Sequence, residues 1–294
     1  MRRRCLIGFA AVQPPFAGAV WAADAPLRLA VGEEMADQRF DFPQLLLQAL
    51  LHASGLPARL ERVPARGTSG MVRRVVDAEA DCAVLPSTGG FDPALRPLKM
   101  PMRRGLLGAR LLLARRERLR ELASLRSLAA LKRRFVLGYG ADWQDAPLMR
   151  TLGFKLRVYQ GYGELFQALG RGEVDYLHRG VNEVWAEMDH PTLVPHGIAV
   201  VPGLALSYPL DDYFHFGPSW HERLPQLQAG ARILLESGVY RRLFMSTFGP
   251  ALQRADFEGR RVLQVVGYGV APGTPIRDFD AMRLQPTQAE LEAG

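Results

Sequence analysis

The sequence predicts an α/β protein made of two successive units, each with a mainly parallel sheet flanked by helices. Two patterns and the composition support this fold class. Short apolar strands alternate with amphipathic helices from residue 27 onward, and a second alternation of the same kind starts at residue 135. Hydrophobic residues fill 48% of the 294 positions, so the chain can bury one large core or two smaller ones.

The first unit opens with Leu27 to Gly32, an apolar segment that predicts a strand ending in glycine. Phe42 to Gly55 follows, with apolar residues at helical spacing and a glycine at its end. The next segments predict a strand, a helix and a buried strand, and they read "ARLERVPA", "SGMVRRVVDAEA" and "CAVLP". This βαβαβ order implies parallel strands with helices on the faces of the sheet.

The second unit follows a polar, helix-prone segment, "RRERLRELASLRSLAALKRR". Its strands and helices alternate in the order "FVLGYG", "DWQDAPLMRTLG", "KLRVYQG", "YGELFQALGRGE" and "VDYLHRG". A long helical segment, His221 to Gly249, comes next, with core spacing at Leu224, Leu227, Ala231, Leu234 and Leu235. From Pro250 onward the chain is rich in glycine and proline, and only "RRVLQVVGYG" predicts a strand.

The N-terminus has the features of a secretory signal. Residues 2–4 are arginines, an apolar run extends to Val20, and small residues around Trp21 suit cleavage. We therefore expect residues 1–22 to be a signal peptide and the mature protein to be periplasmic. Gln13 and the two prolines after it interrupt the apolar run, so a retained or imperfect signal is the alternative. No later segment has the roughly 18 apolar residues that a membrane helix needs.

The charge and cysteine content argue against several classes of partner. The formal net charge is +7, and loss of the three signal arginines lowers it to +4. The other arginine pairs are scattered among acids without interleaved aromatic residues, so we expect no nucleic-acid partner. Cys5 lies in the signal and Cys82 remains single, which leaves no internal disulfide. The histidines lack metal-binding spacing, so we expect no metal and no cofactor.

Three parts of the chain together resemble the periplasmic solute-binding proteins of family 3, which serve amino-acid transporters. Gly70 to Gly105 resembles that family's stretch of helix, aspartate-bearing strand and later arginine. Leu122 to Gly140, followed by Tyr162 to Leu177, is similar to its second-lobe pattern of "sL.dLkg..vgv..G" and "al..GevDa". His221 to Gly249 is similar to its final helix pair. The likeness covers Pro26 to Gly249.

The resemblance implies the two-lobed type II periplasmic-binding-protein fold. In that fold the chain builds most of lobe one, crosses to lobe two and returns to complete lobe one. The implied division is residues 23–108 for the first part of lobe one, 109–208 for lobe two, 209–250 for the return, and 251–294 for a C-terminal tail. The two crossings, near Leu106 to Leu113 and Ser207 to Tyr213, would form the hinge.

The resemblance also implies a ligand clamp in lobe one, made of hydroxyl groups and an arginine. Ser87 and Thr88 fall in the hydroxyl position, and Arg96 is the nearest arginine. An arginine fork can donate two parallel hydrogen bonds to a ligand carboxylate. Alternatively, Ser87 caps a loop and Arg96 is a solvated turn residue. A nucleophilic Ser87 is not favoured because no Gly-x-Ser-x-Gly elbow is present, and no Gly-Lys-Ser/Thr follows to make a phosphate loop.

Lobe two is expected to supply a helix start at residues 140–143, an aromatic face, and a residue near His178. The family usually places an aspartate for the ligand ammonium group near this last position, and none stands here, so a plain α-amino acid is not favoured. As alternatives, the aromatic rings belong to the core and the histidine is a satisfied strand-end residue. The predicted ligand-binding residues are Ser87, Thr88, Arg96, Tyr139, Asp142, Trp143 and His178. Weaker candidates are Tyr159, Tyr162, Asp211 and Asp212.

The expected function is binding without chemistry. The ligand would be a small polar solute, with carboxylates and amino-acid-like compounds among the candidates, and the protein would be a monomer. The partner would be an ABC-transporter permease of the inner membrane or a receptor ectodomain. One alternative is an exported enzyme resembling the cyclohexadienyl dehydratases, with candidate acids Glu33, Asp92, Asp142 and Glu183. Another is a degenerate member that acts as an interaction module.

Overall fold

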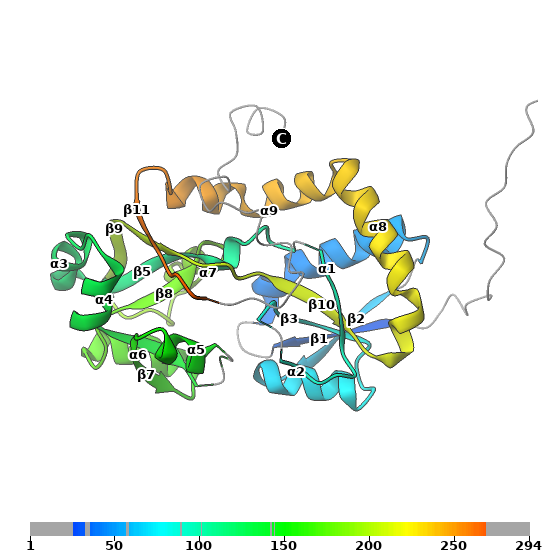
Figure 1. The fold of residues 1–294 in the computed structure, drawn as a ribbon, viewed down its shortest axis with the longest axis horizontal. Helices are drawn as coiled ribbons and strands as arrows, with labels where there is room; N and C mark the ends of the chain where they lie inside the picture. The colour runs from blue at the N-terminus through cyan, green and yellow to red at the C-terminus, as the bar shows by residue number, and fades with distance from the viewer. Residues whose placement is uncertain are drawn as a thin grey trace, which may run out of the picture.

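The computed structural model describes residues 26–32, 36–56, 59–88, 90–100, 102–141, 143 and 145–268, with backbone alone for residues 36–40. The expected signal peptide, residues 1–22, lies outside this part of the chain. Two lobes lie next to each other along the long axis of the molecule, and a long helix runs along one side of both (Figure 1). The predicted α/β class is confirmed.

Lobe one is built on a five-stranded sheet in the order β2-β1-β3-β10-β4. Its strands are β1 (Leu27–Gly32), β2 (Leu60–Ala65), β3 (Cys82–Pro86), β4 (Arg96–Leu98) and β10 (Asp212–Phe216). β1 is parallel to β2 and β3, whereas β10 is antiparallel to β3 and β4. The returning chain therefore inserts β10 between two strands that are neighbours in the sequence.

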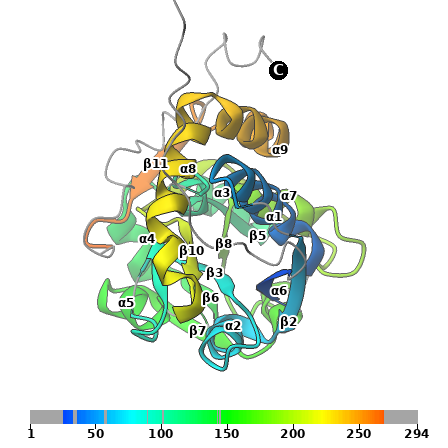
Figure 2. The ribbon, with the colours of Figure 1, turned by 90° about the vertical axis from the view of Figure 1, so that its right-hand side faces the viewer.

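Helices cover both faces of this sheet. α1 and α9 lie on one side of it and α2 lies on the other (Figures 1 and 2). The helices of lobe one are α1 (Ala36–Ala53), α2 (Gly67–Val76), the 3₁₀ helix η3 (Pro218–Arg223), α8 (Leu224–Glu236) and α9 (Val239–Ala255). The long helix expected over residues 221–249 is divided between α8 and α9, because Gly238 adopts a left-handed conformation at φ 72°.

Lobe two contains a four-stranded sheet in the order β11-β9-β5-β8 and a two-stranded sheet of β6 and β7. Its strands are β5 (Ala109–Arg115), β6 (Val136–Gly140), β7 (Lys155–Tyr159), β8 (Leu177–Gly180), β9 (Ile198–Ser207) and β11 (Arg261–Gln264). β5 pairs antiparallel with β8 and β9. This differs from the mainly parallel sheet expected, because β5 leads the chain into the lobe and β9 leads it back.

Short helices surround these two sheets. They are η1 (Leu106–Gly108), η2 (Arg116–Arg118), α3 (Leu119–Ala123), α4 (Leu128–Arg134), α5 (Ala146–Thr151), α6 (Tyr162–Arg171) and α7 (Val181–Met188). α7 faces α9, where the Trp185 indole donates a hydrogen bond of 3.0 Å to the Ala251 carbonyl. Arg254 adds an ion pair of 2.9 Å to Asp189. α9 therefore contacts lobe two as well as lobe one.

Three phenylalanine rings join α1 to α9 in the core of lobe one. The Phe42 ring centroid lies 4.7 Å from that of Phe248 and 6.2 Å from that of Phe244. Phe244 and Phe248 are 5.1 Å apart, one turn from each other on α9. These edge-to-face contacts add to the burial of large aromatic surfaces. They fix α9 on lobe one, and α9 in turn contacts lobe two.

The two expected crossings touch each other. The Gly108 amide donates to the Leu210 carbonyl at 3.1 Å, and the Tyr208 amide donates to the Gly108 carbonyl at 3.2 Å. A Cβ atom at Gly108 would lie 1.8 Å from the Tyr208 carbonyl oxygen. Only glycine allows this approach of two backbones.

A third connection joins the lobes at the C-terminus. Part of the expected tail, residues 251–268, completes α9 and forms β11, which pairs in parallel with β9. The Val265 amide also donates to the Ser207 carbonyl at 2.8 Å. Residues 269–294 lie outside the described part of the chain.

The Gly108→Ala substitution should destabilise the protein by about 3 kcal/mol, because the added methyl group forces the two crossings apart. The free energy of unfolding from urea titration measures this effect. Gly163→Ala is the matched control, since no atom lies within 4 Å of its added methyl group. This change in a helix should be neutral or stabilising by up to about 1 kcal/mol. Equal effects of the two substitutions would contradict the tight crossing.

Candidate functional site

A cavity of about 210 Å³ lies between the lobes. Four strands end beside it, at Gly32 of β1, Pro86 of β3, Gly140 of β6 and Tyr159 of β7. Open α/β sheets bind ligands at the carboxyl ends of their parallel strands, where loops and helix starts converge. The cavity is therefore the candidate site.

The neighbouring residues Ser87 and Thr88 have different roles in the structure. The Ser87 amide donates to the Asp211 carbonyl at 2.7 Å, and the Ser87 hydroxyl accepts from the Asp211 amide at 3.0 Å. Ser87 thus fastens the end of β3 to the returning crossing. Thr88 borders the cavity, and its buried hydroxyl has no hydrogen-bond partner among the described residues.

Arg96 lies outside the cavity, which corrects the expectation that it faces the cleft. It is exposed on β4, where it pairs with Phe216 of β10. The physical reason is the insertion of β10, which displaces β4 from the end of β3. The arginine that reaches the cavity from this side is Arg103.

The expected aromatic face is present in lobe two. Tyr139 and Trp143 both border the cavity, with their ring centroids 4.6 Å apart and edge to face. Tyr159 and Tyr162 border it as well. Asp142 lies outside the described residues.

His178 is buried behind this face and does not border the cavity. Its ring meets the rings of Tyr139 and Tyr208 edge-on, with centroids 5.7 and 5.8 Å away. Burial lowers the pKa of His178 well below its usual value, and the charges of Arg110 and Arg179 lower it further. A neutral imidazole in this position is a core group.

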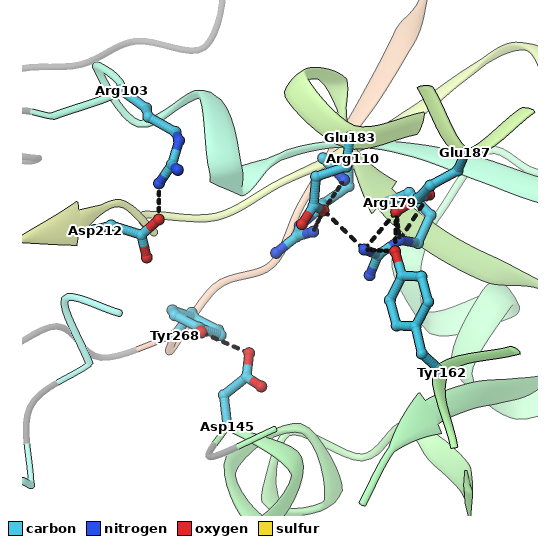
Figure 3. Close-up of polar contacts among 10 residues, drawn as sticks. Arg103, Arg110, Asp145, Tyr162, Arg179, Glu183, Glu187, Asp212 and Tyr268 are labelled. Atoms are coloured by element: carbon cyan, nitrogen blue, oxygen red, sulfur yellow. Dashed lines mark hydrogen bonds and ion pairs between the residues drawn. The ribbon is translucent and has the colours of Figure 1, made fainter. Parts of the chain in front are cut away.

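Three buried arginines were missed by the sequence analysis. Arg103, Arg110 and Arg179 all border the cavity and are 4%, 6% and 2% exposed. Arg103 pairs with Asp212, and Arg110 pairs with Glu183 at 3.0 Å (Figure 3). Buried arginines require such partners because an unpaired charge is costly to desolvate.

Arg179 is the centre of the largest network. It donates to Glu187 at 2.7 to 3.0 Å and to the Tyr162 hydroxyl at 2.8 Å, and it lies 3.2 Å from Glu183. Its guanidinium carbon also lies 4.9 Å from the centroid of the Trp143 ring. These contacts hold the end of β8, the start of α6 and helix α7 together.

A sequence signal for part of this network did exist. Arg110 stands between Ala109 and Leu111 in an apolar run, and Arg179 lies near the end of the predicted strand "VDYLHRG". A charge in such a place implies a buried partner. Glu183 follows Arg179 by only four residues, so the sequence places an acid close to this arginine. No comparable signal distinguishes Arg103 from the adjacent Arg104.

The C-terminal segment contributes to the same site. The Tyr268 hydroxyl donates to Asp145 at 2.7 Å, and Asp145 borders the cavity (Figure 3). The Tyr268 ring is buried against Tyr208, with centroids 4.4 Å apart. Burial and the nearby Asp145 charge raise the pKa of Tyr268, so the hydroxyl remains a donor.

The arrangement suits binding more than proton transfer. Glu183 is held by two arginines, Asp212 by one, and Asp145 by a tyrosine hydroxyl. Asn182 and Thr88 each bring a buried oxygen atom without a hydrogen-bond partner in the described chain. In that same part of the molecule, no group of three acidic, cysteine or histidine side chains is placed to hold a metal ion.

Comparisons with known proteins agree on the fold. The periplasmic VFT2 domain of BvgS from Bordetella pertussis matches with a TM-score of 0.55 at 13% identity, over 75% of this chain and 92% of that one. The GluR0 ligand-binding core from Nostoc punctiforme, in complex with L-glutamate, matches with a TM-score of 0.55 at 13% identity, over 76% and 100%. The chain has the type II periplasmic-binding-protein fold.

A third example is a periplasmic His/Glu/Gln/Arg/opine family-binding protein from Silicibacter pomeroyi in complex with lysine. Its TM-score is 0.54 at 15% identity, and 76% of this chain covers 97% of that one. No family model and no curated protein matches the sequence. Within the residues described, no helix is both long and apolar enough to cross a membrane.

In this type II fold, Asp211 ties the two crossings together. Its carboxylate accepts hydrogen bonds from the amides of Arg103, at 2.9 and 3.1 Å, and Gly105, at 2.9 Å. Burial raises the pKa of Asp211 to about 7, although the amides of Gly105 and Arg103 and the Arg103 charge oppose this shift. The carboxyl group therefore titrates near neutral pH at the junction of the lobes.

The raised pKa of Asp211 predicts a pH-dependent stability. Between about pH 4 and 7 the folded state holds a proton that the unfolded state has lost. This contribution to stability therefore declines over that interval and is lost once the pH has risen through 7. Relative to Asp211→Asn, the wild type should lose on the order of 2 kcal/mol of unfolding free energy between pH 5 and 8. Urea titrations at each pH measure it, with the exposed Asp189→Asn as control. A constant difference between wild type and Asp211→Asn would contradict the raised pKa.

Proposed function

We propose that the protein is an exported solute-binding protein that closes its two lobes on a small polar solute. The observation that carries this proposal is the cavity between the lobes, which receives side chains from both. Thr88 comes from lobe one and Asn182 from lobe two, and each has a buried oxygen without a partner in the described residues. A solute that reaches both oxygens completes hydrogen bonds that the protein leaves unmade.

Ligand-driven closure follows from this geometry. Only a closed arrangement brings Thr88 and Asn182 to one solute. The solute therefore makes more contacts in the closed state than in the open state, and this difference stabilises the closed state. The hinge would be the paired crossings around Gly108 and Tyr208, whose hydrogen bonds restrict the motion to rotation. Asp211 and Ser87 fasten these crossings to lobe one.

The structural relatives support a solute-binding role and two kinds of partner. Those with bound ligands hold L-glutamate and lysine. Another relative is a histidine kinase sensor domain, matched at 15% identity with a TM-score of 0.55 over 77% of this chain and 97% of that one. We therefore propose that the closed form docks on an inner-membrane permease or forms part of a receptor ectodomain. The periplasm is the proposed location, and the monomer the proposed state.

The alternative dehydratase chemistry receives no support from the positions of the candidate acids. Glu33 and Asp142 lie outside the described residues. Asp92 is exposed and accepts a hydrogen bond from the Ala94 amide at 2.8 Å, away from the cavity. Glu183 borders the cavity but is paired with Arg110 and Arg179. Turnover of an added cyclohexadienyl acid would overturn the binding role proposed above.

Native mass spectrometry of the purified protein should release a small polar solute, and calorimetric titration with that solute should give a saturable isotherm. Thr88→Val and Asn182→Ala should each weaken binding by about 3- to 10-fold, the cost of one hydrogen bond. Arg96→Ala should leave the affinity unchanged because Arg96 lies outside the cavity. Loss of binding in Arg96→Ala alone, or the absence of any thermal shift with a broad metabolite panel, would refute the proposed site.

A further inference from the structure

The charges around the cavity restrict the chemical class of its solute. Each arginine that borders it already has a carboxylate partner within the chain: Arg103 has Asp212, Arg110 has Glu183, and Arg179 has Glu187. A solute carboxylate would therefore meet arginines whose charge is already compensated, although the buried Nε of Arg110 has no hydrogen-bond partner in the described chain. Removing one member of a buried pair leaves an uncompensated charge, which is strongly unfavourable.

Asp145 differs from the other acids at the cavity. It forms no ion pair with any cation in the described chain, and the Tyr268 hydroxyl is its hydrogen-bond donor there. Its side chain makes no capping hydrogen bond to α5, although it stands at the N-cap position. The Asp145 carboxylate is therefore a half-buried negative charge that faces the cavity without a counter-charge.

The charges of the side chains around the cavity add up to a negative value, like the charge of Asp145 itself. The three arginines that border the cavity are balanced by three bordering acids, Asp145, Glu183 and Asp212. Glu187 lies directly behind Arg179 and is fully buried, which adds one more negative charge. Among the described residues, the site thus lacks one cation.

The aromatic lining is suited to a cation. Tyr139 and Trp143 border the same cavity as Asp145, and an aromatic face attracts a cation within about 6 Å. The chain already uses this interaction, because the Arg179 guanidinium lies 4.9 Å from the Trp143 ring centroid. Positive charge is therefore stable beside these rings.

We propose that the solute carries an amine, guanidinium or quaternary ammonium group and no carboxylate, and that its cation pairs with Asp145. This inference rests on the proposed solute-binding function and gives that function a substrate class. It separates the site from one that clamps the carboxylate of an amino acid, because the charge of each arginine at this cavity is already paired with a carboxylate of the chain. The cavity of about 210 Å³ limits the solute to a small compound.

Three pairs of compounds that differ by one carboxylate test the proposal with the wild-type protein. They are agmatine and L-arginine, putrescine and L-ornithine, and choline and glycine betaine, and in choline a hydroxymethyl group replaces the carboxylate. Within any pair that binds, calorimetric titration should give at least about tenfold tighter binding for the member without the carboxylate. L-glutamate and succinate should not bind. Equal or tighter binding of the carboxylate-bearing members, or of the two anions, would overturn the proposal.

Asp145→Asn tests the role of the carboxylate itself. This substitution keeps an oxygen acceptor for Tyr268 and removes the charge, so it should weaken binding of the preferred cation at least about tenfold. Asp189→Asn is the matched control, because Asp189 pairs with Arg254 on the exposed surface outside the cavity. Unchanged affinity in Asp145→Asn would overturn the proposal, and the paired compounds decide it if that variant does not fold.

The solute released in native mass spectrometry distinguishes a failure of this inference from a failure of the proposed solute-binding function. A released compound that titrates back into the cavity and has a cationic group without a carboxylate supports both. A released anion or neutral compound that titrates back keeps the solute-binding function and overturns the cationic class. If no compound is released and none of the panel binds, the solute-binding function and this inference both fail.

Discussion

The structure depends on the contact between the two backbone segments that cross from lobe to lobe. Gly108 and Tyr208 exchange hydrogen bonds with the opposite crossing at a separation that no other residue type at position 108 would allow. Asp211 binds the amides of the incoming crossing, and Ser87 binds the backbone of Asp211. This junction sets where Arg103, Arg110 and Asp212 enter the cleft, because all three lie within a few residues of it.

The buried charges give the cleft its character. Arginines with 2% to 6% exposure would be prohibitively costly alone, and each is neutralised by a carboxylate on another element of the structure. Such pairs hold helices and strands in register, as Arg179 does for β8, α6 and α7. They also compensate the charge of these arginines, whereas Asp145 has no counter-charge and the oxygens of Thr88 and Asn182 have no hydrogen-bond partner in the described chain, so a solute can satisfy these three groups.

The C-terminal segment changes the mechanics of the two lobes. α9 packs on α1 through three phenylalanine rings and on α7 through Trp185, and the chain then continues into β11 beside β9. Within the described residues, the chain therefore connects the lobes three times, twice at the crossings and once behind them. Tyr268, which follows β11, brings this connection into the site through Asp145. A change in the position of α9 would thus be transmitted to the cavity.

Local patterns in the sequence determined the α/β class, the two units and most helices and strands, because the periodicity of apolar residues depends only on neighbours along the chain. They also indicated that Thr88, Tyr139 and Trp143 lie near the cleft, since these residues lie at the ends of strands, or just after them, where the carboxyl ends of the strands meet. Strand order was decided by the tertiary structure: β10 inserts between β3 and β4, and this moves Arg96 away and brings Arg103 in. The partners of Arg103 and Arg110, the buried position of His178 and the arrival of Tyr268 from the expected tail were decided in the same way. These contacts join residues up to 123 positions apart, and no local pattern specifies which distant segments will meet.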